Sequence, residues 1–374
     1  MKKIFWAIQS LDNAGGSEAV STNLMNLLCP YYDITLVSVC SFDKGVHHLD
    51  PRIKVVSLGI DKRVGRFDQY WREYGWKHPF KRLALFQKMM NGFFWAKSHY
   101  RKLIKNMMGE EDIFIASSLD SYIYAPKGRT CYFHYHFNAP KFLSFGESSG
   151  LKMARKPDKW IFLAKSTEDD IKKGRKKLPP STYVYNPVKF PLKENLNYND
   201  NALIFIGRYT EQKDPMLALN IAKILHDEGY PFHFDMYGDG HLEDEMRAFV
   251  RSNNLNEVNI HTKTAITPEH FTNHDLMLMT SKYEGYVLVK GEANVNSIPV
   301  ISSPWEGPHE EMFLNRGDGV VVKSRDPKDY AEEIKKWLGD KDKVIANKKV
   351  CFDFASHYYD DETIVRKWKE ILEK

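Results

Sequence analysis

The sequence predicts an α/β protein made of two doubly wound domains, each with a parallel sheet, that face each other across a cleft. Short apolar segments alternate with helical segments along the whole chain, and the alternation restarts after a polar, strand-poor stretch at residues 191–201. The length of 374 residues and the apolar fraction of 43% suffice for two cores. We expect an N-terminal domain at 1–188, a second domain at 189–355, and a C-terminal helix within 356–374 that packs back on the first domain.

The predicted strands of the first domain are apolar runs rich in β-branched and aromatic residues. They are Ile4–Gln9, Ile34–Val39, Lys54–Leu58, Asp112–Ala116, Thr130–Phe133, Trp160–Leu163 and Thr182–Tyr185. Helical periodicity is expected over Lys81–Met108.

The second domain repeats this order of elements. Its predicted strands are Leu203–Ile206, Phe232–Tyr237, Val258–His261, Leu276–Met279, Val300–Ser302 and Gly319–Val322. Its predicted helices are Pro215–His226, Leu242–Asn253 and Asp326–Leu338, and a terminal helix covers Asp361–Lys374.

Composition excludes several classes of protein. No apolar stretch approaches the roughly 20 residues needed to cross a bilayer. The first apolar run, Ile4 to Ile8, is too short for a secretion signal, so we interpret it as a strand. The four cysteines lie far apart, without the paired spacing of zinc or redox sites, as is typical of a reducing cytoplasm. A cytoplasmic location is expected.

The net charge is +5, and positive charge gathers in residues 61–109, where aromatic residues are interleaved with lysine and arginine. This composition indicates contact with a membrane surface or an anionic polymer, so the segment is expected to place the protein on the inner face of the cell membrane. The alternative is an ordinary helical insertion whose aromatic residues pack into the core.

A glycine-containing loop, Asn13–Ser17, follows the first strand and opens a helix. Its Gly15 and Gly16 would let backbone N–H groups approach an anion at the helix N-terminus. The alternative is a plain tight turn in which Ser17 caps the helix.

In the second domain, the loop after the first strand carries Gly207, Arg208 and Lys213. Two cations at a strand's carboxyl end could hold a diphosphate through charge-assisted hydrogen bonds, although each cation alone could simply be solvated. The turn containing Gly238 follows the next strand, where it could approach a phosphate or a sugar or be a turn without function.

The stretch Thr280–Ser302 carries two glutamates, Glu284 and Glu292, between two predicted strands. Because ligands bind at the carboxyl ends of strands in open α/β sheets, both carboxylates could face one crevice. Two solvated surface glutamates are the alternative.

Two histidines, His134 and His136, stand at the end of a first-domain strand. On an extended chain they lie on the same side, where they could transfer a proton or bind a substrate hydroxyl. A metal pair and a packed aromatic strand end are the alternatives.

Together these motifs resemble the retaining glycosyltransferases of family 4, which have the GT-B fold. The resemblance is strongest over Leu203–Asp326, which contains Gly207-Arg208-x4-Lys213, Tyr237-Gly-Asp-Gly240, Glu284-Gly285, the Glu284-x7-Glu292 spacing and Ile298-Pro-Val-Ile301 in the family's order. The first half matches through Gly15-Gly16 and the segment His136–Pro140.

The resemblance implies a role for each matching residue. Arg208 and Lys213 would neutralise the nucleotide diphosphate, Glu284 would bind the donor sugar, and Glu292 would bind the ribose. His136 would lie at the sugar. The remaining implied donor-binding positions are Gly15, Gly16, Gly207, Gly238, Ser281, Gly285, Tyr286 and Val287.

The resemblance also implies a UDP-sugar donor, a cell-surface glycan or lipid-linked acceptor, and no metal or other cofactor. The sequence Asp340-Lys-Asp342 has the form used by metal-dependent sugar transferases, but it follows a helix, so we interpret it as a solvated loop. The chain departs from the family at Val287, where a glycine is frequent, and at Val295–Ser297, where Ala-Cys-Gly is frequent.

Two alternatives to this function remain open. A GT-B sugar-nucleotide epimerase would act on the same donor without an acceptor. A non-enzymatic protein that binds nucleic acid or another polyanion would use the positive charge alone. We expect no nucleic-acid partner.

Overall fold

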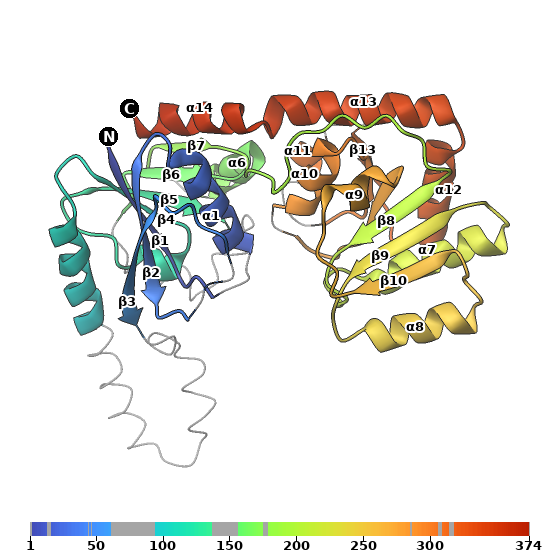
Figure 1. Cartoon of the computed structure of the whole chain (residues 1–374), viewed down its shortest axis with the longest axis horizontal. Coiled ribbons are helices and arrows are strands. Elements are labelled where there is room, and N and C mark those ends of the chain that lie inside the picture. Colours follow the sequence, from blue (N-terminus) through green and yellow to red (C-terminus); the bar gives the residue numbers. More distant parts are fainter. Residues whose placement is uncertain are drawn as a thin grey trace, which may run out of the picture. The chain divides into compact units, whose positions relative to one another are not determined.

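The computed structural model describes residues 2–12, 16–43, 45, 47–60, 94–136, 156–174, 179–284, 286–305, 309–313 and 318–373. Predictions that concern residues 61–93, Gly15 or Gly285 lie outside this part of the chain. Two compact units are present: Met1–Val184 with Lys367–Lys374, and Tyr185–Arg366 (Figure 1). The boundary expected after Val188 falls in the strand-free segment that opens the second unit.

The first unit is built on a parallel sheet that has seven strands in the described ranges, in the order β3-β2-β1-β4-β5-β6-β7. The strands are β1 (Lys3–Ile8), β2 (Asp33–Cys40), β3 (Lys54–Ile60), β4 (Ile113–Ala116), β5 (Thr130–Tyr135), β6 (Lys159–Phe162) and β7 (Ser181–Tyr183). Each overlaps a strand predicted from the sequence. The chain runs from β1 outward to β3 and then crosses to β4 on the other side of β1, which makes the sheet doubly wound.

The described helices of the first unit are α1 (Gly16–Leu28), a helix over residues 94–107, α4 (Leu119–Tyr122) and α6 (Lys165–Gly174). In the helix at 94–107, Ala96 and Ile104 are buried, and Ile104 packs into the core of the sheet. The inward packing proposed as an alternative for the aromatic residues of this segment is wrong for Phe94 and Trp95, which are 49% and 64% exposed.

The second unit contains a six-stranded parallel sheet within the residues described, in the order β10-β9-β8-β11-β12-β13. The strands are β8 (Ala202–Ile206), β9 (His233–Gly238), β10 (Val258–Thr262), β11 (Leu276–Met279), β12 (Val300–Ser302) and β13 (Gly319–Val321). This sheet is also doubly wound, as predicted.

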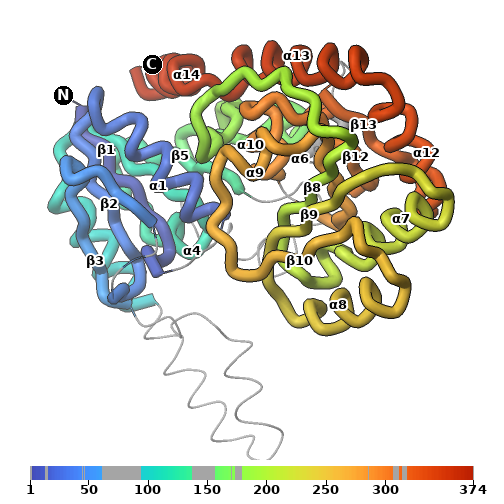
Figure 2. Tube along the Cα trace, turned by 45° about the vertical axis from the view of Figure 1, so that its right-hand side comes forward, coloured from blue at the N-terminus to red at the C-terminus, as the bar shows by residue number. Residues whose placement is uncertain are grey.

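Both faces of the second sheet are buried, because successive side chains of a strand point to opposite faces. Leu203 and Leu278 pack on one face, in a core to which α7 (Pro215–Asp227) and α12 (Pro327–Leu338) contribute. Ile204 and Met277 pack on the other, in a core that α10 (Leu288–Val295) shares. Figure 2 shows α7 and α8 on one side of β8–β10, with α9 and α10 on the other.

The remaining helices of the second unit are α8 (Glu243–Ser252), α9 (Pro268–Thr272), α11 (His309–Met312), α13 (Lys341–Tyr358) and α14 (Asp361–Leu372), whose last residues belong to the first unit. The sequence analysis missed α13, because charged residues interrupt its apolar positions. Asp340, interpreted as part of a solvated loop, is the N-cap of α13, and its side chain accepts from the backbone N–H groups of Asp342 and Lys343.

The end of α14 packs on the first sheet. The Trp368 ring lies 5.1 Å from the Trp6 ring and 5.3 Å from the His134 ring, between centroids. Lys2 Nζ donates to the Leu372 carbonyl at 2.7 Å, which holds the two ends of the chain together (Figure 2).

Among the described ranges, no helix is long and apolar enough to cross a membrane. All four cysteines are buried.

A buried ion pair anchors α13. Lys348 and Asp275 are fully buried, and Lys348 Nζ lies 2.9 Å from Asp275 Oδ1. The same ammonium donates to the carbonyl oxygens of His274, at 2.9 Å, and Asn197. Asp275 in turn accepts from the backbone N–H groups of Asn199 and Ala202. The pair therefore joins α13 to the start of β8 and the start of β11.

Replacing the buried lysine should destabilise the fold. Lys348→Met would leave the Asp275 carboxylate buried without its cation, so we expect the free energy of unfolding to fall by about 3 kcal/mol. Lys349→Met, on the exposed neighbour that pairs with Asp353, should change it by less than about 1 kcal/mol. Denaturant unfolding measures both, and equal effects would contradict the anchoring role of Lys348.

Candidate functional site

The candidate site of the second unit lies between β8 and β11, where the direction in which successive strands are added to the sheet reverses. The chain leaves β8 toward β9 and β10, then returns to β11 on the other side of β8. Because β8 and β11 are parallel neighbours, the loops that follow Ile206 and Met279 emerge side by side at one edge of the sheet. This topological switch point is where open α/β sheets bind ligands, and it carries Gly207, Arg208, Lys213 and Glu284.

The loop after β8 is locked to the loop after β9. The Gly207 N–H donates to the Tyr237 carbonyl at 3.0 Å, and the Tyr209 N–H donates to the Asp239 carbonyl at 2.7 Å. A Cβ added at Gly238 would lie 2.0 Å from the Gly207 carbonyl oxygen. Only glycine allows this approach, so the role of Gly238 in the structure is to let the two loops touch.

A buried tyrosine, Tyr209, also fixes the loop after β8. The Tyr209 side chain is fully buried, and its hydroxyl lies 2.7 Å from the Met236 carbonyl oxygen and 3.0 Å from the His261 carbonyl oxygen. Tyr209 therefore ties the loop to β9 and β10 and leaves its neighbour Arg208 exposed at the sheet edge.

The two loops of the switch point are joined by an ion pair between Lys213 and Glu284. The exposed fractions of these side chains are 18% and 9%, so the pair is largely shielded from water. Arg208 Nη2 donates to Gln212 Oε1 at 2.9 Å, and Gln212 Nε2 donates to the Tyr283 carbonyl at 3.1 Å. The structure thus brings Glu284 together with Arg208 and Lys213, which the sequence analysis had placed on a different loop.

Arg325 is a residue of this site that the sequence analysis missed. Its Nη2 donates to Asp214 Oδ2 at 2.7 Å and to the Thr280 carbonyl at 2.8 Å. Asp214 caps α7, so Arg325 links the start of α7 to the end of β11. No local motif marks Arg325, because its partners are distant in sequence.

Ser281 is buried, and its carbonyl accepts from the Ser303 hydroxyl at 2.5 Å and from Arg325 Nη1 at 3.2 Å. These bonds hold the start of the loop that leads to Glu284. The contribution of Ser281 in the structure is its backbone.

The two departures from the family pattern have structural explanations. Val287 is 3% exposed and packs in the core with Val188 and Trp305, so its side chain fills the interior. Ser297 has a φ of 64°, a left-handed conformation that favours glycine. Its hydroxyl oxygen accepts from the Asn195 N–H at 3.0 Å, which fixes the segment before β8.

Glu292 lies on α10 and is partly buried. Burial raises the pKa of its carboxyl group to about 7, while the charge of Lys189 lowers it. Within the described ranges, no hydrogen bond reaches this carboxylate; only its backbone carbonyl is engaged, by Asn296. A shielded carboxylate with open acceptor positions is suited to bind hydroxyl groups.

In the first unit, Gly16 is the first residue of α1, which follows β1. The order of the strands in that sheet reverses at β1, between β2 and β4. A Cβ added at Gly16 would meet no heavy atom within 4 Å, so the space in front of it is open. Ser17, considered as the helix cap, lies inside α1 and donates to Glu18 Oε2 at 2.6 Å.

The two histidines lie together, as their spacing suggested. His136 Nε2 is 3.0 Å from His134 Nδ1, so one nitrogen donates and the other accepts. Burial lowers the pKa of His136 to about 3, and burial together with His136 lowers that of His134. Both imidazoles are therefore neutral at physiological pH. In the described part of the chain, no three His, Cys, Asp or Glu side chains gather as a metal site requires.

A family model matches part of the chain. Residues 189–349, in the second unit, match the model described as glycosyl transferases group 1. The curated relatives include an amylovoran biosynthesis glycosyltransferase of Erwinia amylovora, 27% identical over 46% of this chain and 48% of that protein. A poly(ribitol-phosphate) alpha-N-acetylglucosaminyltransferase of Staphylococcus aureus is 23% identical over 45% of this chain and 34% of that protein. The match thus spans about half of the first relative and a third of the second.

Solved structures define the fold class. TarM of Staphylococcus aureus, in complex with fondaparinux, alpha-GlcNAc-glycerol and UDP, has a TM-score of 0.74 at 15% identity, with 100% of both chains covered. HepE of Anabaena, in complex with UDP and glucose, has a TM-score of 0.70 at 15% identity, also with full coverage. Two Rossmann-like parallel-sheet units with these structural neighbours make the architecture GT-B, as the sequence predicted.

The raised pKa of Glu292 predicts a pH dependence of stability. Below about pH 4.5 the carboxyl group is neutral in both folded and unfolded chains, and between about 4.5 and 7 only the unfolded chain ionises. The native state is therefore destabilised as pH rises, and Glu292→Gln removes this effect. We expect the variant to gain on the order of 2–3 kcal/mol relative to wild type between pH 4.5 and 8.

Denaturant unfolding of the ligand-free protein at several pH values measures this gain. Glu245→Gln, on the exposed face of α8, is the matched control and should show no comparable trend. A difference between Glu292→Gln and wild type that does not change with pH would contradict the assignment.

Proposed function

We propose that this chain is a retaining, family 4-like glycosyltransferase that moves a sugar from a UDP-sugar to a hydroxyl group of a glycan or lipid-linked acceptor and releases UDP. The observation that carries the proposal is the Lys213–Glu284 ion pair at the switch point of the second sheet, beside the exposed Arg208. Cations and a carboxylate in one place suit a ligand with both phosphates and hydroxyl groups.

The cations supply the charge that the reaction needs. When the bond between the anomeric carbon and the diphosphate breaks, its electron pair moves to a phosphate oxygen. Arg208 and Lys213 stabilise this developing charge, as positioned donors do in other transfer reactions. They take the role that a divalent ion has elsewhere, so the proposed reaction is independent of metal.

The two carboxylates, Glu284 and Glu292, bind different parts of the donor. Glu284 binds sugar hydroxyl groups beside Lys213. The backbone N–H groups of Tyr286 and Val287, which follow in the chain, bind the phosphate or the sugar. The resemblance assigns the ribose to Glu292, and a shielded carboxylate with open acceptor positions supports that role. The proposed roles of Gly16 at the phosphates and His136 at the sugar remain predictions.

The relatives support the class of donor and acceptor. UDP is bound in the TarM and HepE structures. The curated relatives are named for amylovoran biosynthesis and for transfer of N-acetylglucosamine to poly(ribitol-phosphate). A cell-envelope polymer or its lipid-linked precursor is accordingly the proposed acceptor. The enzyme would act in the cytoplasm, at the inner face of the membrane.

UDP should stabilise the protein in a thermal-shift assay. Arg208→Ala should weaken UDP binding at least about tenfold, because one charge-assisted hydrogen bond is worth roughly 1.5–3 kcal/mol. Arg251→Ala, which removes an exposed arginine from the end of α8, is the matched control and should bind UDP normally.

GDP and ADP serve as comparison ligands in the same assay. Preference for either would contradict the choice of UDP, and no stabilisation by any nucleoside diphosphate would contradict the transferase proposal. Salt-dependent polyanion binding that Glu284→Ala leaves unchanged would favour the non-enzymatic alternative.

Transfer from the matching UDP-sugar should persist in excess EDTA and keep the anomeric configuration of the donor. Product NMR reads the configuration through the anomeric coupling constant. An inverted product would contradict the retaining mechanism, and loss of turnover that added Mg²⁺ restores would contradict metal independence. Release of a free epimer without acceptor would identify an epimerase.

A further inference from the structure

The helix over residues 94–107 carries a row of cations along one side. Lys97, Arg101 and Lys105 are each four residues apart, so their side chains lie one above another on the helix surface. The exposed apolar residues Trp95 and Leu103 lie on other sides of the helix, because each residue adds a turn of about 100°. The row of cations therefore has its own surroundings, separate from those of the apolar residues.

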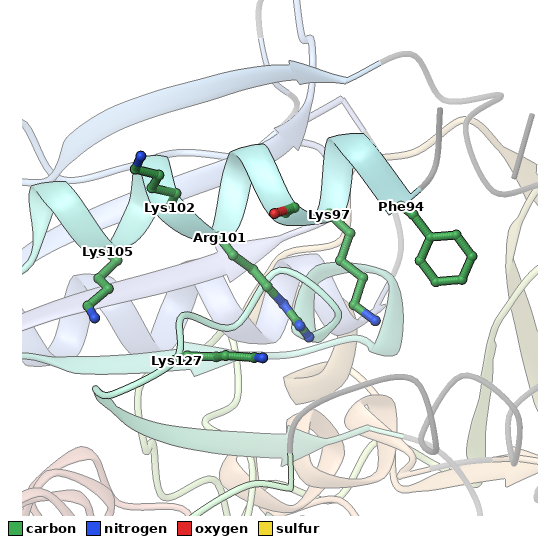
Figure 3. Close-up of a pocket in the computed structure, with 7 residues that line it drawn as sticks. Phe94, Lys97, Arg101, Lys102, Lys105 and Lys127 are labelled. Carbon is green, nitrogen blue, oxygen red and sulfur yellow. The ribbon is translucent and has the colours of Figure 1, made fainter. Parts of the chain in front are cut away.

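A pocket of about 370 Å³ lies beside this row. Its lining is Phe94, Lys97, Ser98, Arg101, Lys102, Lys105 and Lys127, and none of these residues is acidic. Figure 3 shows Lys97, Arg101 and Lys105 extending toward the loop that carries Lys127, whereas Lys102 extends from another side of the helix. From Phe94 to Lys105 the lining follows the helix over roughly 16 Å.

The positive charge of this pocket is concentrated and only partly offset. Lys105 Nζ would lie 3.5 Å from a Cβ added at Gly128, which places this ammonium against the loop of Lys127. Within the described ranges, no carboxylate forms an ion pair with Lys105 or Lys127. Burial, followed by the charges of Arg101 and Lys127, lowers the pKa of Lys97. The cations repel one another, and a bound anion would offset that repulsion.

The topology of the first sheet gives the pocket a direction. The helix ends at residue 107, shortly before β4 begins at Ile113, so its last turn lies at the amino edge of the sheet. Arg129, just before β5, donates from Nη2 to the Met108 carbonyl at 3.0 Å at the same edge. The Phe94 end therefore points toward the carboxyl edge, where Gly16 follows β1.

Repeated cations beside one aromatic ring suit a chain that carries both phosphate groups and sugar or polyol units. Ammonium and guanidinium groups bind phosphate oxygens strongly, and the Ile123 carbonyl, 2.8 Å from Arg101 Nε, holds that guanidinium in place. Phe94, which is 49% exposed, offers an apolar face to the C–H groups of a sugar. The Ser98 hydroxyl can both donate to and accept from sugar hydroxyl groups.

Two other polyanions fit this geometry less well. A membrane is one surface, and it cannot contact the cation row together with Trp95 and Leu103 on other sides of the helix. A single-stranded nucleic acid binds through successive aromatic platforms for its bases, and Phe94 is the one aromatic residue in the described lining. A flexible chain can follow the row of cations along the helix.

We propose that this pocket binds a phosphate-bearing glycan or polyol chain, and that this chain is the acceptor. The chain lies along the helix and leads toward the carboxyl edge of the first sheet. Its identification as the acceptor rests on the proposed function, whereas its binding to the pocket does not. The acceptor is thereby assigned to an acidic class, recognised at a distance from the hydroxyl group that receives the sugar.

Binding of the full-length protein to labelled oligomers of glycerol phosphate and of hexose phosphate, without UDP, tests the site. Lys105→Gln with Lys127→Gln should weaken binding about tenfold, because two charge-assisted contacts are lost at an exposed site. Arginine at both positions should retain binding, which separates loss of charge from loss of fold. Failure of wild type to bind either oligomer, or equal binding of neutral dextran, would overturn the proposal.

Lys323→Gln with Lys328→Gln removes the same charge from exposed positions of the second unit and is the matched control. This variant should bind the oligomers within about twofold of wild type. Equal weakening by the two double variants would overturn the proposal, because binding would then depend on net charge alone.

Three further ligands distinguish the chain from other polyanions. Phe94→Ala should weaken binding of the sugar and polyol phosphates and leave binding of inorganic polyphosphate unchanged. Equal weakening of both would contradict the role of Phe94 at a sugar. Tighter binding of wild type to phosphatidylglycerol vesicles or to oligothymidylate than to the phosphate oligomers would overturn the choice of ligand.

Transfer separates an acceptor from a polyanion that only binds. With a mixture of UDP-sugars, wild type should add sugar to the oligomers, and the Lys105 and Lys127 double glutamine variant should raise KM about tenfold with kcat unchanged. Binding without glycosylation would overturn the acceptor assignment, while stabilisation by UDP would still support the proposed function. Oligomer binding without stabilisation by UDP would contradict the proposed function, and with it the acceptor assignment, and leave the pocket as a binding site.

Discussion

The ion pair between Lys213 and Glu284 is the contact on which the candidate site depends. It joins the loop after β8 to the loop after β11 at the switch point of the sheet. The backbone around it is fixed independently, by the approach of Gly238 to Gly207 and by Arg325 on the end of β11. The pair therefore stands on a rigid frame, and a diphosphate could engage the lysine without unfolding the loop.

Buried charge serves two different purposes in the second unit. Lys348 with Asp275 and Lys290 with Asp318 are completely buried, and Lys290 also lies over the Phe354 ring at 4.6 Å. These pairs are enclosed by the core and have no access to a ligand, so their role is structural. Glu292 differs, because its carboxyl group is shielded but open to hydroxyl donors. Burial alone therefore does not distinguish a binding residue from a structural one; open hydrogen-bonding positions do.

Much of the fold could be predicted because parallel strands buried on both faces form continuous apolar runs. Each described strand overlaps its predicted segment, and the restart after residues 191–201 revealed the second sheet. Helix α13 was missed because charged residues interrupt its apolar positions, and one of them, Lys348, is fully buried. The exposed Trp95 was equally ambiguous, since periodicity does not show which face of a helix the core covers.

The sequence by itself determined the doubly wound class and placed Arg208, Lys213 and Glu284 on loops at strand ends, because the positions of strands and loops along the chain follow from local pattern. Only the tertiary structure paired Lys213 with Glu284 and added Arg325 to the site. These contacts join residues far apart in the chain, and their geometry depends on which strands become neighbours. The two glutamates of the stretch Thr280–Ser302 are thereby distinguished physically. Glu284 is ion-paired, whereas the carboxylate of Glu292 is shielded and open to hydroxyl donors.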